Sequence, residues 1–91
     1  MKLKWTDQAS LDLVRVRDFL LPLNPAVALK TVRVLRAAVL KLVDHPRLGS
    51  PMERYSSQDI RRLIVGQYEI RYEVRKDTTF VVRLWHTRED R

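Results

Sequence analysis

The stretch IRRLIVGQYEIRYEVR, residues 60–75, decides the fold, because its side chains alternate where those before it follow a helical period. IRRLIV (60–65) and YEIRYEVR (68–75) are each typical of a strand, and Gly66-Gln67 between them predicts a tight turn. In the second strand one face carries Tyr68, Ile70, Tyr72 and Val74, and the other carries Glu69, Arg71, Glu73 and Arg75. The stretch therefore predicts an antiparallel strand pair with one buried face and one charged face.

A third strand, TFVVRLW (79–85), follows a short link at residues 76–78, which favours an antiparallel meander. In this strand we expect Phe80, Val82 and Leu84 to face the core. The outward side chains are then expected to be Val81, Arg83 and Trp85. The segment before the meander, residues 44–59, contains two prolines and a glycine and is predicted to be one long loop.

The first half of the chain predicts a short strand followed by two helices. KLKW (2–5) has the composition of a strand, and Thr6 stands where a helix N-cap belongs. An amphipathic period then runs through Ala9, Leu13, Val16 and Leu20, and Pro22 ends that helix. Asn24-Pro25 gives a second start signal, an N-cap followed by proline at the first helical position.

The second helix is expected to run to about Val43 and to contain no acidic residue. Its buried stripe is predicted to be Ala28, Val32, Leu35, Val39 and Leu42. The three-residue link at 23–25 makes the two helices an antiparallel hairpin. We therefore predict one α+β domain over residues 1–91, in the order β-α-α-β-β-β. The helix hairpin would cover one face of a small, mainly antiparallel twisted sheet.

Composition narrows the classes of function. The 91 residues include no cysteine, which excludes disulfides, thiolate nucleophiles and cysteine-based zinc sites. No apolar run approaches a membrane span and the start is too polar for a signal peptide, so we expect a cytoplasmic protein. The formal charge of +7 favours acidic partners, whether nucleic acid or acidic protein segments.

Five ordered motifs are similar to one family. They are W-T-D-Q-A-x-x-D-L (5–13), F-L-x-x-x-N-P (19–25), L-x-x-x-P-x-x-G-x-P (42–51), YEIRY (68–72) and L-W-H-x-R-E-D-R (84–91). Together they resemble the ParE/RelE superfamily of type II toxin–antitoxin toxins, over the whole chain. The resemblance implies a cytoplasmic toxin that needs no cofactor or metal and forms a hetero-oligomer with a cognate antitoxin.

The resemblance leaves two branches of function open. RelE-like members are ribosome-dependent mRNA endonucleases, whereas ParE-like members poison DNA gyrase and arrest growth. Metal-independent RNA cleavage needs groups that move protons and cations at the phosphate. In this sequence the catalytic candidates for the nuclease branch are Arg61, Arg71, Arg83, His86 and Arg88. His86 also has a plain structural interpretation, as a ring that packs at a strand end.

Two departures from the nuclease pattern favour the ParE-like branch. The tyrosine that opens the middle strand, Tyr68, is followed by Glu69, where RelE-like nucleases typically have a catalytic arginine. A carboxylate there would repel a scissile phosphate. No later tyrosine follows Tyr72 in this sequence. We therefore expect a toxin that inhibits gyrase by binding, with the endonuclease as the alternative.

The predicted contact residues form two groups. On the open sheet face, the antitoxin is expected to bind Arg61, Arg71, Arg83 and Trp85. The tail residues His86, Arg88 and Arg91 are expected to contact the target. A third hypothesis is a nucleic-acid-binding module, in which the second helix would present Lys30, Arg33, Arg36 and Lys41 to phosphates. We rank it last and do not expect the chain alone to bind nucleic acid.

Overall fold

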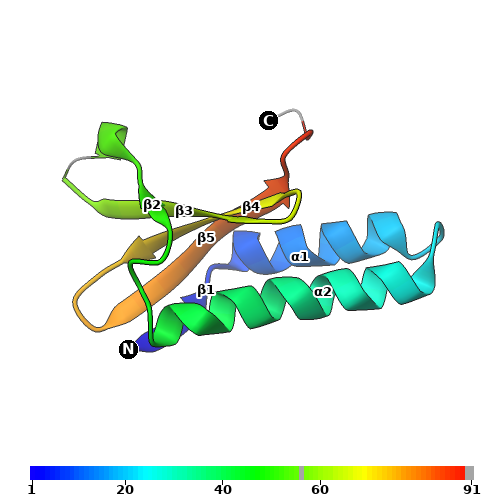
Figure 1. The fold of residues 1–91 in the computed structure, drawn as a ribbon, viewed down its shortest axis with the longest axis horizontal. Helices are drawn as coiled ribbons and strands as arrows, with labels where there is room; N and C mark the ends of the chain where they lie inside the picture. Colours follow the sequence, from blue (N-terminus) through cyan, green and yellow to red (C-terminus); the bar gives the residue numbers. More distant parts are fainter. Residues whose placement is uncertain (56, 90–91) are drawn as a thin grey trace.

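The computed structural model describes residues 1–55 and 57–89, in which two helices pack on one face of a five-stranded sheet (Figure 1). The elements are β1 (Lys2–Trp5), α1 (Asp7–Leu20), α2 (Pro25–Leu40), β2 (Ser50–Pro51), β3 (Asp59–Val65), β4 (Tyr68–Val74) and β5 (Thr78–His86). Short 3₁₀ turns lie at Lys41–Val43 and Glu53–Tyr55. The predicted α+β order is confirmed. The segment predicted as one long loop also contains β2, a two-residue strand.

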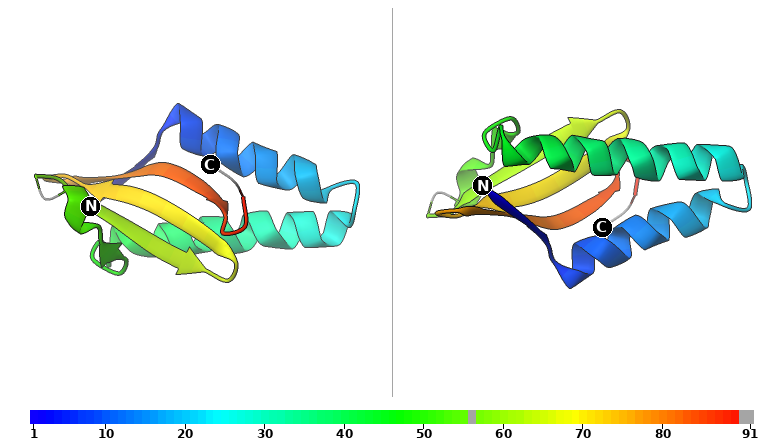
Figure 2. Two further views of the ribbon diagram at one scale, coloured as in Figure 1. Left: turned by 90° about the horizontal axis from the view of Figure 1, so that it is seen from above. Right: turned by 90° about the horizontal axis from the view of Figure 1, so that it is seen from below.

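The sheet has the strand order β1-β5-β4-β3-β2. β1 pairs with β5 in parallel, and every other neighbouring pair is antiparallel. Both views in Figure 2 show the helix hairpin lying along one side of the sheet, and Figure 1 shows its closed end extending beyond the β3–β4 turn. Neither helix is long and apolar enough to cross a membrane, within the residues that the structure describes.

Both predicted helix starts are confirmed by their cap contacts. The Thr6 hydroxyl oxygen accepts a hydrogen bond from the backbone N–H of Ala9 at 3.1 Å. The Asn24 side-chain oxygen accepts from the N–H groups of Ala26 and Val27 at 3.1 and 3.2 Å. Each cap satisfies donors that the first helical turn leaves without a partner, a contribution of about 1 kcal/mol.

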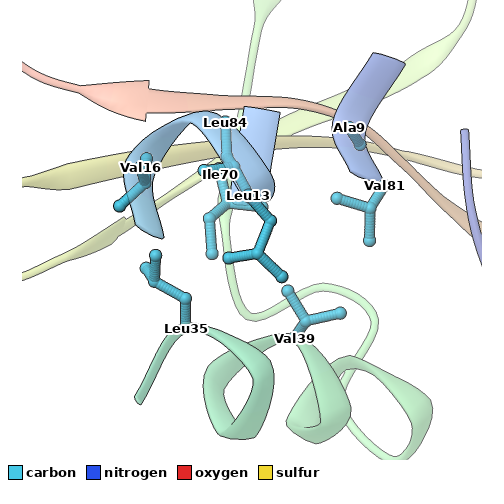
Figure 3. Close-up of a cluster of buried hydrophobic side chains, with 8 residues drawn as sticks. All are labelled: Ala9, Leu13, Val16, Leu35, Val39, Ile70, Val81 and Leu84. Atoms are coloured by element: carbon cyan, nitrogen blue, oxygen red, sulfur yellow. The ribbon is translucent and has the colours of Figure 1, made fainter. Parts of the chain in front are cut away.

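The core lies between the hairpin and the sheet (Figure 3). Its buried cluster consists of Ala9, Leu13, Val16, Leu35, Val39, Ile70, Val81 and Leu84. α1, α2, β4 and β5 all contribute, so the cluster joins the two halves of the chain. Each large apolar side chain here contributes about 1.5–3 kcal/mol through its removal from water.

A bulge in β5 overturns part of the predicted face assignment. Tyr72 lies opposite Val81 while Arg71 lies opposite Arg83, so Val82 is an extra residue in the ladder. Val81 and Leu84, three residues apart, are therefore both buried. The prediction was right for Leu84 but wrong for Val81, which points inward. Phe80 was also assigned wrongly, because its ladder partner Glu73 places it on the outer face.

The alternation of β3 corrects a second assignment. Leu63 and Val65 pack against the core, so Arg61, two residues before Leu63, shares their inner face. Arg61 lies opposite the buried Tyr72, and Arg62 lies opposite Arg71 on the outer face. The prediction that Arg61 lies on the open sheet face is therefore wrong, and Arg62 takes that place.

Candidate functional site

An apolar groove of about 800 Å³ lies between the closed half of the helix hairpin and the β3–β4 turn. Its helical walls are Arg15, Val16, Phe19, Leu20, Lys30, Thr31, Val34 and Leu35. The opposite wall is residues 65–68, and the end of β5 and the following tail add His86, Arg88 and Glu89. The groove thus brings together segments from both ends of the chain.

The closed end of the helix hairpin extends beyond the β3–β4 turn, on the side where the groove lies (Figure 1). At this end of the molecule Phe19 on α1 and Val34 on α2 remain largely exposed, and so do Leu23 and Val27 farther along the hairpin. Side chains of this size are normally removed from water in a folded chain, and a cluster of exposed ones commonly marks a binding surface. The sequence predicted the helices but not this overhang.

The rim of the groove is basic. Arg15 is held by two carboxylates, but Lys30 and Arg88 make no ion pair within residues 1–55 and 57–89. The carboxylate of Glu89, the acid among the groove residues, is taken up by Arg15. An apolar ligand carrying acidic groups at its margins therefore matches this groove.

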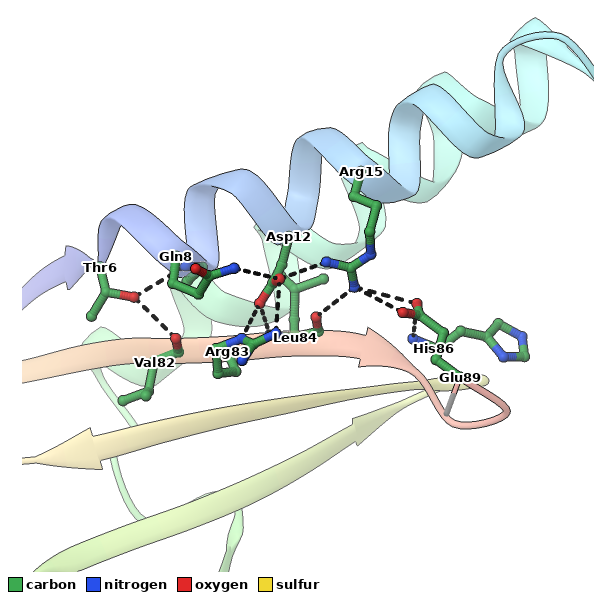
Figure 4. A network of polar contacts seen from close by, with 10 residues as sticks. Thr6, Gln8, Asp12, Arg15, Val82, Arg83, Leu84, His86 and Glu89 are labelled. Atoms are coloured by element: carbon green, nitrogen blue, oxygen red, sulfur yellow. Dashed lines mark hydrogen bonds and ion pairs between the residues drawn. The ribbon is translucent and has the colours of Figure 1, made fainter. Parts of the chain in front are cut away.

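Asp12 organises the polar contacts between α1 and β5 (Figure 4). Its fully buried carboxylate accepts hydrogen bonds from the Leu84 N–H at 3.0 Å, from Arg83 Nε at 2.8 Å and from Arg15 Nη1 at 2.6 Å. Burial raises the pKa of this carboxyl, but the hydrogen bonds from Arg83, Leu84 and Arg15 outweigh it and hold the pKa below its ordinary value. Asp12 is therefore an ionised anchor, which sequence reasoning did not single out.

The tail after β5 is tied to α1 and to the β3–β4 turn. Glu89 accepts hydrogen bonds from Arg15 Nη2 at 3.0 Å and from the His86 N–H at 3.0 Å. His86 Nδ1 accepts from the Arg88 N–H at 3.1 Å, which leaves Nε2 to donate to Gln67 Oε1 at 3.0 Å. His86 thus makes structural contacts and also lines the groove. Arg91, the third residue of the predicted target-binding group, lies outside the described residues.

The other predicted antitoxin contacts are Arg71, Arg83 and Trp85, and both arginines form ion pairs within the chain. The Arg71 guanidinium lies 4.7 Å from the centre of the Trp85 ring and bonds Glu69 at 3.2 Å. Trp85 is only 2% exposed, so its ring is covered within the chain itself. The Arg83 guanidinium forms an ion pair with the Asp12 carboxylate, with Nε 2.8 Å from Oδ2. Arg62, missed by sequence reasoning, is exposed opposite Arg71. The alternation of β3 gave no signal for it, because Ile60 and Ile64 share the face of Arg62 while Leu63 and Val65 share the face of Arg61.

The nuclease candidates do not converge on one point. Arg61 is on the inner face, bonded to Asp59 at 2.9 Å and to the Gly49 carbonyl at 2.9 Å. Arg71 and Arg83 are opposite each other on the outer face, whereas His86 and Arg88 belong to the groove.

Two tyrosines lie near these candidates, Tyr72 fully buried and Tyr68 partly buried. Burial raises the pKa of both Tyr68 and Tyr72, so both phenols are neutral at neutral pH. Neither hydroxyl is therefore set up as a base for taking a proton from RNA.

The basic residues that the nucleic-acid hypothesis assigns to the second helix lie mostly outside the groove. Arg33 and Arg36 are exposed on the helix, and Lys41 follows in the 3₁₀ turn, while Lys30 alone reaches the groove. Among the described residues, no three His, Asp or Glu side chains gather as metal ligands.

The helix hairpin on one face of a small mixed sheet, in the order β-α-α-β-β-β, agrees with the fold that the ParE/RelE resemblance of the sequence implied. The sequence profile of the ParE toxin of the type II toxin–antitoxin system parDE matches residues 3–91. The chain belongs to this ParE toxin family.

Two similar proteins extend this result. Toxin RelE2 of Caulobacter vibrioides is 31% identical over 83 residues, which cover 90% of each chain. A chain from the chromosomal ParDE toxin–antitoxin system of P. aeruginosa superposes with a TM-score of 0.80 and 27% identity, and the match covers 94% of this chain and 95% of that one. The expected superfamily and fold are confirmed.

Proposed function

We propose that this chain is a toxin that inhibits DNA gyrase by binding, arrests growth in the cytoplasm and is neutralised by a cognate antitoxin. The observation that carries this proposal is the match to the ParE toxin family across residues 3–91. A second support is the ParDE toxin–antitoxin system of the similar solved structure, which pairs a toxin with an antitoxin.

The groove is the surface that best fits an antitoxin helix. Its walls expose Phe19 and Val34 above a floor that includes Val16 and Leu35, which suits the apolar stripe of an amphipathic helix. Acidic side chains along that helix would meet Lys30 at the rim. A helix in this groove would also remove large apolar side chains from water, which is the main source of affinity in such contacts.

The outer sheet face would make a secondary contact with the same antitoxin. Arg71 and Arg83 are partly exposed, and each could also bind a carboxylate of a partner. Because both already have acidic partners, each new contact would contribute little, about 0.2–1 kcal/mol. The buried Trp85 ring would hold the Arg71 guanidinium in place through their cation–π contact, and it would not contact the antitoxin as an exposed side chain.

Inhibition by binding, without chemistry, is the form of toxicity that fits these residues. Glu69 lies buried against Arg71, where it cancels the cation nearest to it on the strand. A phosphate approaching Arg71 would therefore meet a carboxylate as well. We assign contact with gyrase to the tail residues His86, Arg88 and Arg91, in which His86 and Arg88 face the same end of the molecule as the groove.

The alternative, ribosome-dependent mRNA cleavage, has one specific support. The relative from Caulobacter vibrioides carries the name Toxin RelE2. In that case Arg71, Arg83 and the His86–Arg88 pair would have to act from separate places on the sheet.

A gyrase assay with the purified chain separates the two functions. Supercoiling and trapped cleavage complexes are scored with and without the antitoxin, and translating ribosomes with mRNA are scored in parallel. We expect cut DNA to accumulate, the antitoxin to relieve it and the mRNA to stay intact. Cleaved mRNA with unaffected gyrase would replace the proposal by the nuclease alternative.

A further inference from the structure

One face of α2 carries two leucines and two arginines that the fold leaves in water. They are Leu29, Arg33, Arg36 and Leu40, which recur at i, i+4, i+7 and i+11 and therefore lie along one line of the helix, here called the α2 stripe. Leu29 is 60% exposed and Leu40 is 63% exposed, and both arginines are exposed as well. None of the four lines the groove described above, so the stripe is a separate surface.

The two arginines of the stripe have no opposite charge beside them. Neither Arg33 nor Arg36 makes an ion pair within residues 1–55 and 57–89, and α2 contains no acidic residue. Arginines three residues apart on a helix repel each other. Neither lies in the last turn of α2, where the helix dipole would favour a cation. An acidic partner would therefore supply a counter-charge that the chain itself does not provide.

A cleft of about 300 Å³ between α1 and α2 adjoins the stripe at Arg36. Its apolar walls are Trp5, Leu13, Val14 and Val32, and its polar walls are Ser10, Arg17 and Arg36. The cleft shares no residue with the groove. Arg17 already pairs with Asp18 at 3.0 Å, whereas the Arg36 guanidinium is available to a ligand. Apolar walls beside a guanidinium suit an apolar side chain from a protein segment that also carries a carboxylate.

We propose that an acidic segment of DNA gyrase docks on the α2 stripe and inserts an apolar side chain into this cleft. This inference rests on the proposed function and adds a second target contact to the one assigned to the tail. Carboxylates of the segment would pair with Arg33 and Arg36, and its apolar side chains would cover Leu29 and Leu40.

Other occupants match the stripe less well. The phosphates of nucleic acid would pair with the arginines but would leave two large leucines in water. A second copy of this chain would set the arginines of one stripe against those of the other. A protein segment with both carboxylates and apolar side chains satisfies all four residues.

A charge reversal tests the contact, with binding of the purified chain to DNA-free gyrase measured by calorimetric titration. Arg36→Glu is expected to weaken this binding about tenfold, because the acids of the segment would then meet a carboxylate. Lys76→Glu makes the same charge change in the link between β4 and β5 and should alter the affinity less than about threefold. Similar losses for both variants would contradict docking at the stripe.

A second variant tests the apolar part of the contact without changing the charge. Leu40→Gln should also weaken gyrase binding about tenfold, and it should leave α2 folded because leucine and glutamine have similar helix propensities. Leu11→Gln is the matched control, since Leu11 is 61% exposed on α1 and lines neither the cleft nor the groove. Circular dichroism checks the helix content of both variants. Equal affinities for gyrase would remove the leucines from the contact.

Titrations with the antitoxin and with duplex DNA assign the stripe if gyrase is not its partner. Arg36→Glu is expected to change antitoxin affinity less than about threefold, because the stripe and the groove share no residue. A tenfold loss, on the order of one good contact, would assign the stripe to the antitoxin instead. Loss of DNA binding with unchanged affinity for gyrase would assign it to nucleic acid. A dimer of the free chain that Leu40→Gln dissociates would assign it to a second copy.

The same measurements keep this inference apart from the proposed function. A wild-type chain that traps gyrase, together with Arg36→Glu and Leu40→Gln variants that bind gyrase equally tightly, would overturn the docking surface and leave the gyrase proposal intact. A wild-type chain that neither binds nor inhibits gyrase would remove both proposals.

Discussion

The carboxylate of Asp12 accepts a hydrogen bond from the backbone N–H of Leu84, 72 residues away, at 3.0 Å. β1 pairs with β5 only as far as Val81, so beyond that point the edge of β5 would be open. α1 covers it with side chains, because Thr6 donates its hydroxyl to the Val82 carbonyl and Asp12 takes the Leu84 N–H. Side chains of a helix thus replace a neighbouring strand.

Replacing Asp12 by asparagine should destabilise the fold. Asp12→Asn removes a buried charge from two arginines and weakens the contact with Leu84, so we expect a loss of about 2–4 kcal/mol in the free energy of unfolding. In a domain of this size that lowers the Tm by about 4–8 °C for each kcal/mol. Thermal unfolding checks it, with Asp7→Asn, an exposed acid of the same helix, as the control. Equal Tm values for the two variants would contradict the role of Asp12.

The same carboxylate predicts how stability depends on pH. Its pKa is held below the ordinary value in the folded chain, so the unfolded chain binds its proton first as the pH falls. The contribution of Asp12 is therefore complete above about pH 5 and is lost as the pH falls through the unfolded value near 3.9 toward the folded one. Urea unfolding from pH 7 to pH 3 should show the gap between the wild type and Asp12→Asn narrowing at the acid end. A constant gap would mean that the charge contributes nothing.

The two glycines should respond differently to alanine. A Cβ on Gly49 would lie 2.6 Å from the Arg62 carbonyl oxygen and 2.8 Å from the Tyr72 hydroxyl, so Gly49→Ala should cost about 1–3 kcal/mol by forcing β2 away. Gly66 has open space but a φ of 59°, so Gly66→Ala should cost about 1–2 kcal/mol of backbone strain. Gly66→Asn should recover part of that loss, because asparagine tolerates this conformation, while Gly49→Asn should not. Chemical denaturation of the four variants distinguishes the two causes.

A charge placed in the groove should weaken antitoxin binding without unfolding the chain. Val34 is 46% exposed in the groove, whereas Leu29, 60% exposed on the same helix, is not one of the groove residues. We expect Val34→Glu to reduce antitoxin affinity about 100-fold and Leu29→Glu to change it less than about threefold. Calorimetric titration measures both, and circular dichroism confirms the helix content. Comparable affinities would place the antitoxin elsewhere.

The outer sheet face should matter less than the groove. Arg71→Ala combined with Arg83→Ala is expected to reduce antitoxin affinity about tenfold, since both arginines already have acidic partners. The double variant also removes the hydrogen bond between Arg83 and the Asp12 carboxylate, so we expect the Tm of the variant to fall. Its antitoxin affinity must therefore be measured at a temperature well below that Tm. Unchanged affinity would remove the sheet face from the antitoxin contact altogether.

Local features of this chain could be predicted from its residues, because they depend on neighbours in the sequence. Thr6 and Asn24 start helices through contacts within three residues, and Gly66 makes a turn that needs a positive φ. The order of strands and helices followed from the change of period near residue 60, and the ordered motifs indicated the family that the profile then matched.

Tertiary structure alone decided which side of a strand each arginine occupies and where the molecule stays open. A two-residue period looks the same from either face, so only the pairing of β3 with β4 turned Arg61 inward and Arg62 outward. The bulge that buries Val81 depends on β4, and the burial of Asp12 depends on Leu84. The groove lies where the closed end of the helix hairpin extends beyond the β3–β4 turn (Figure 1). Each of these features is set by contacts between segments far apart in the chain, and local periodicity carries no record of them.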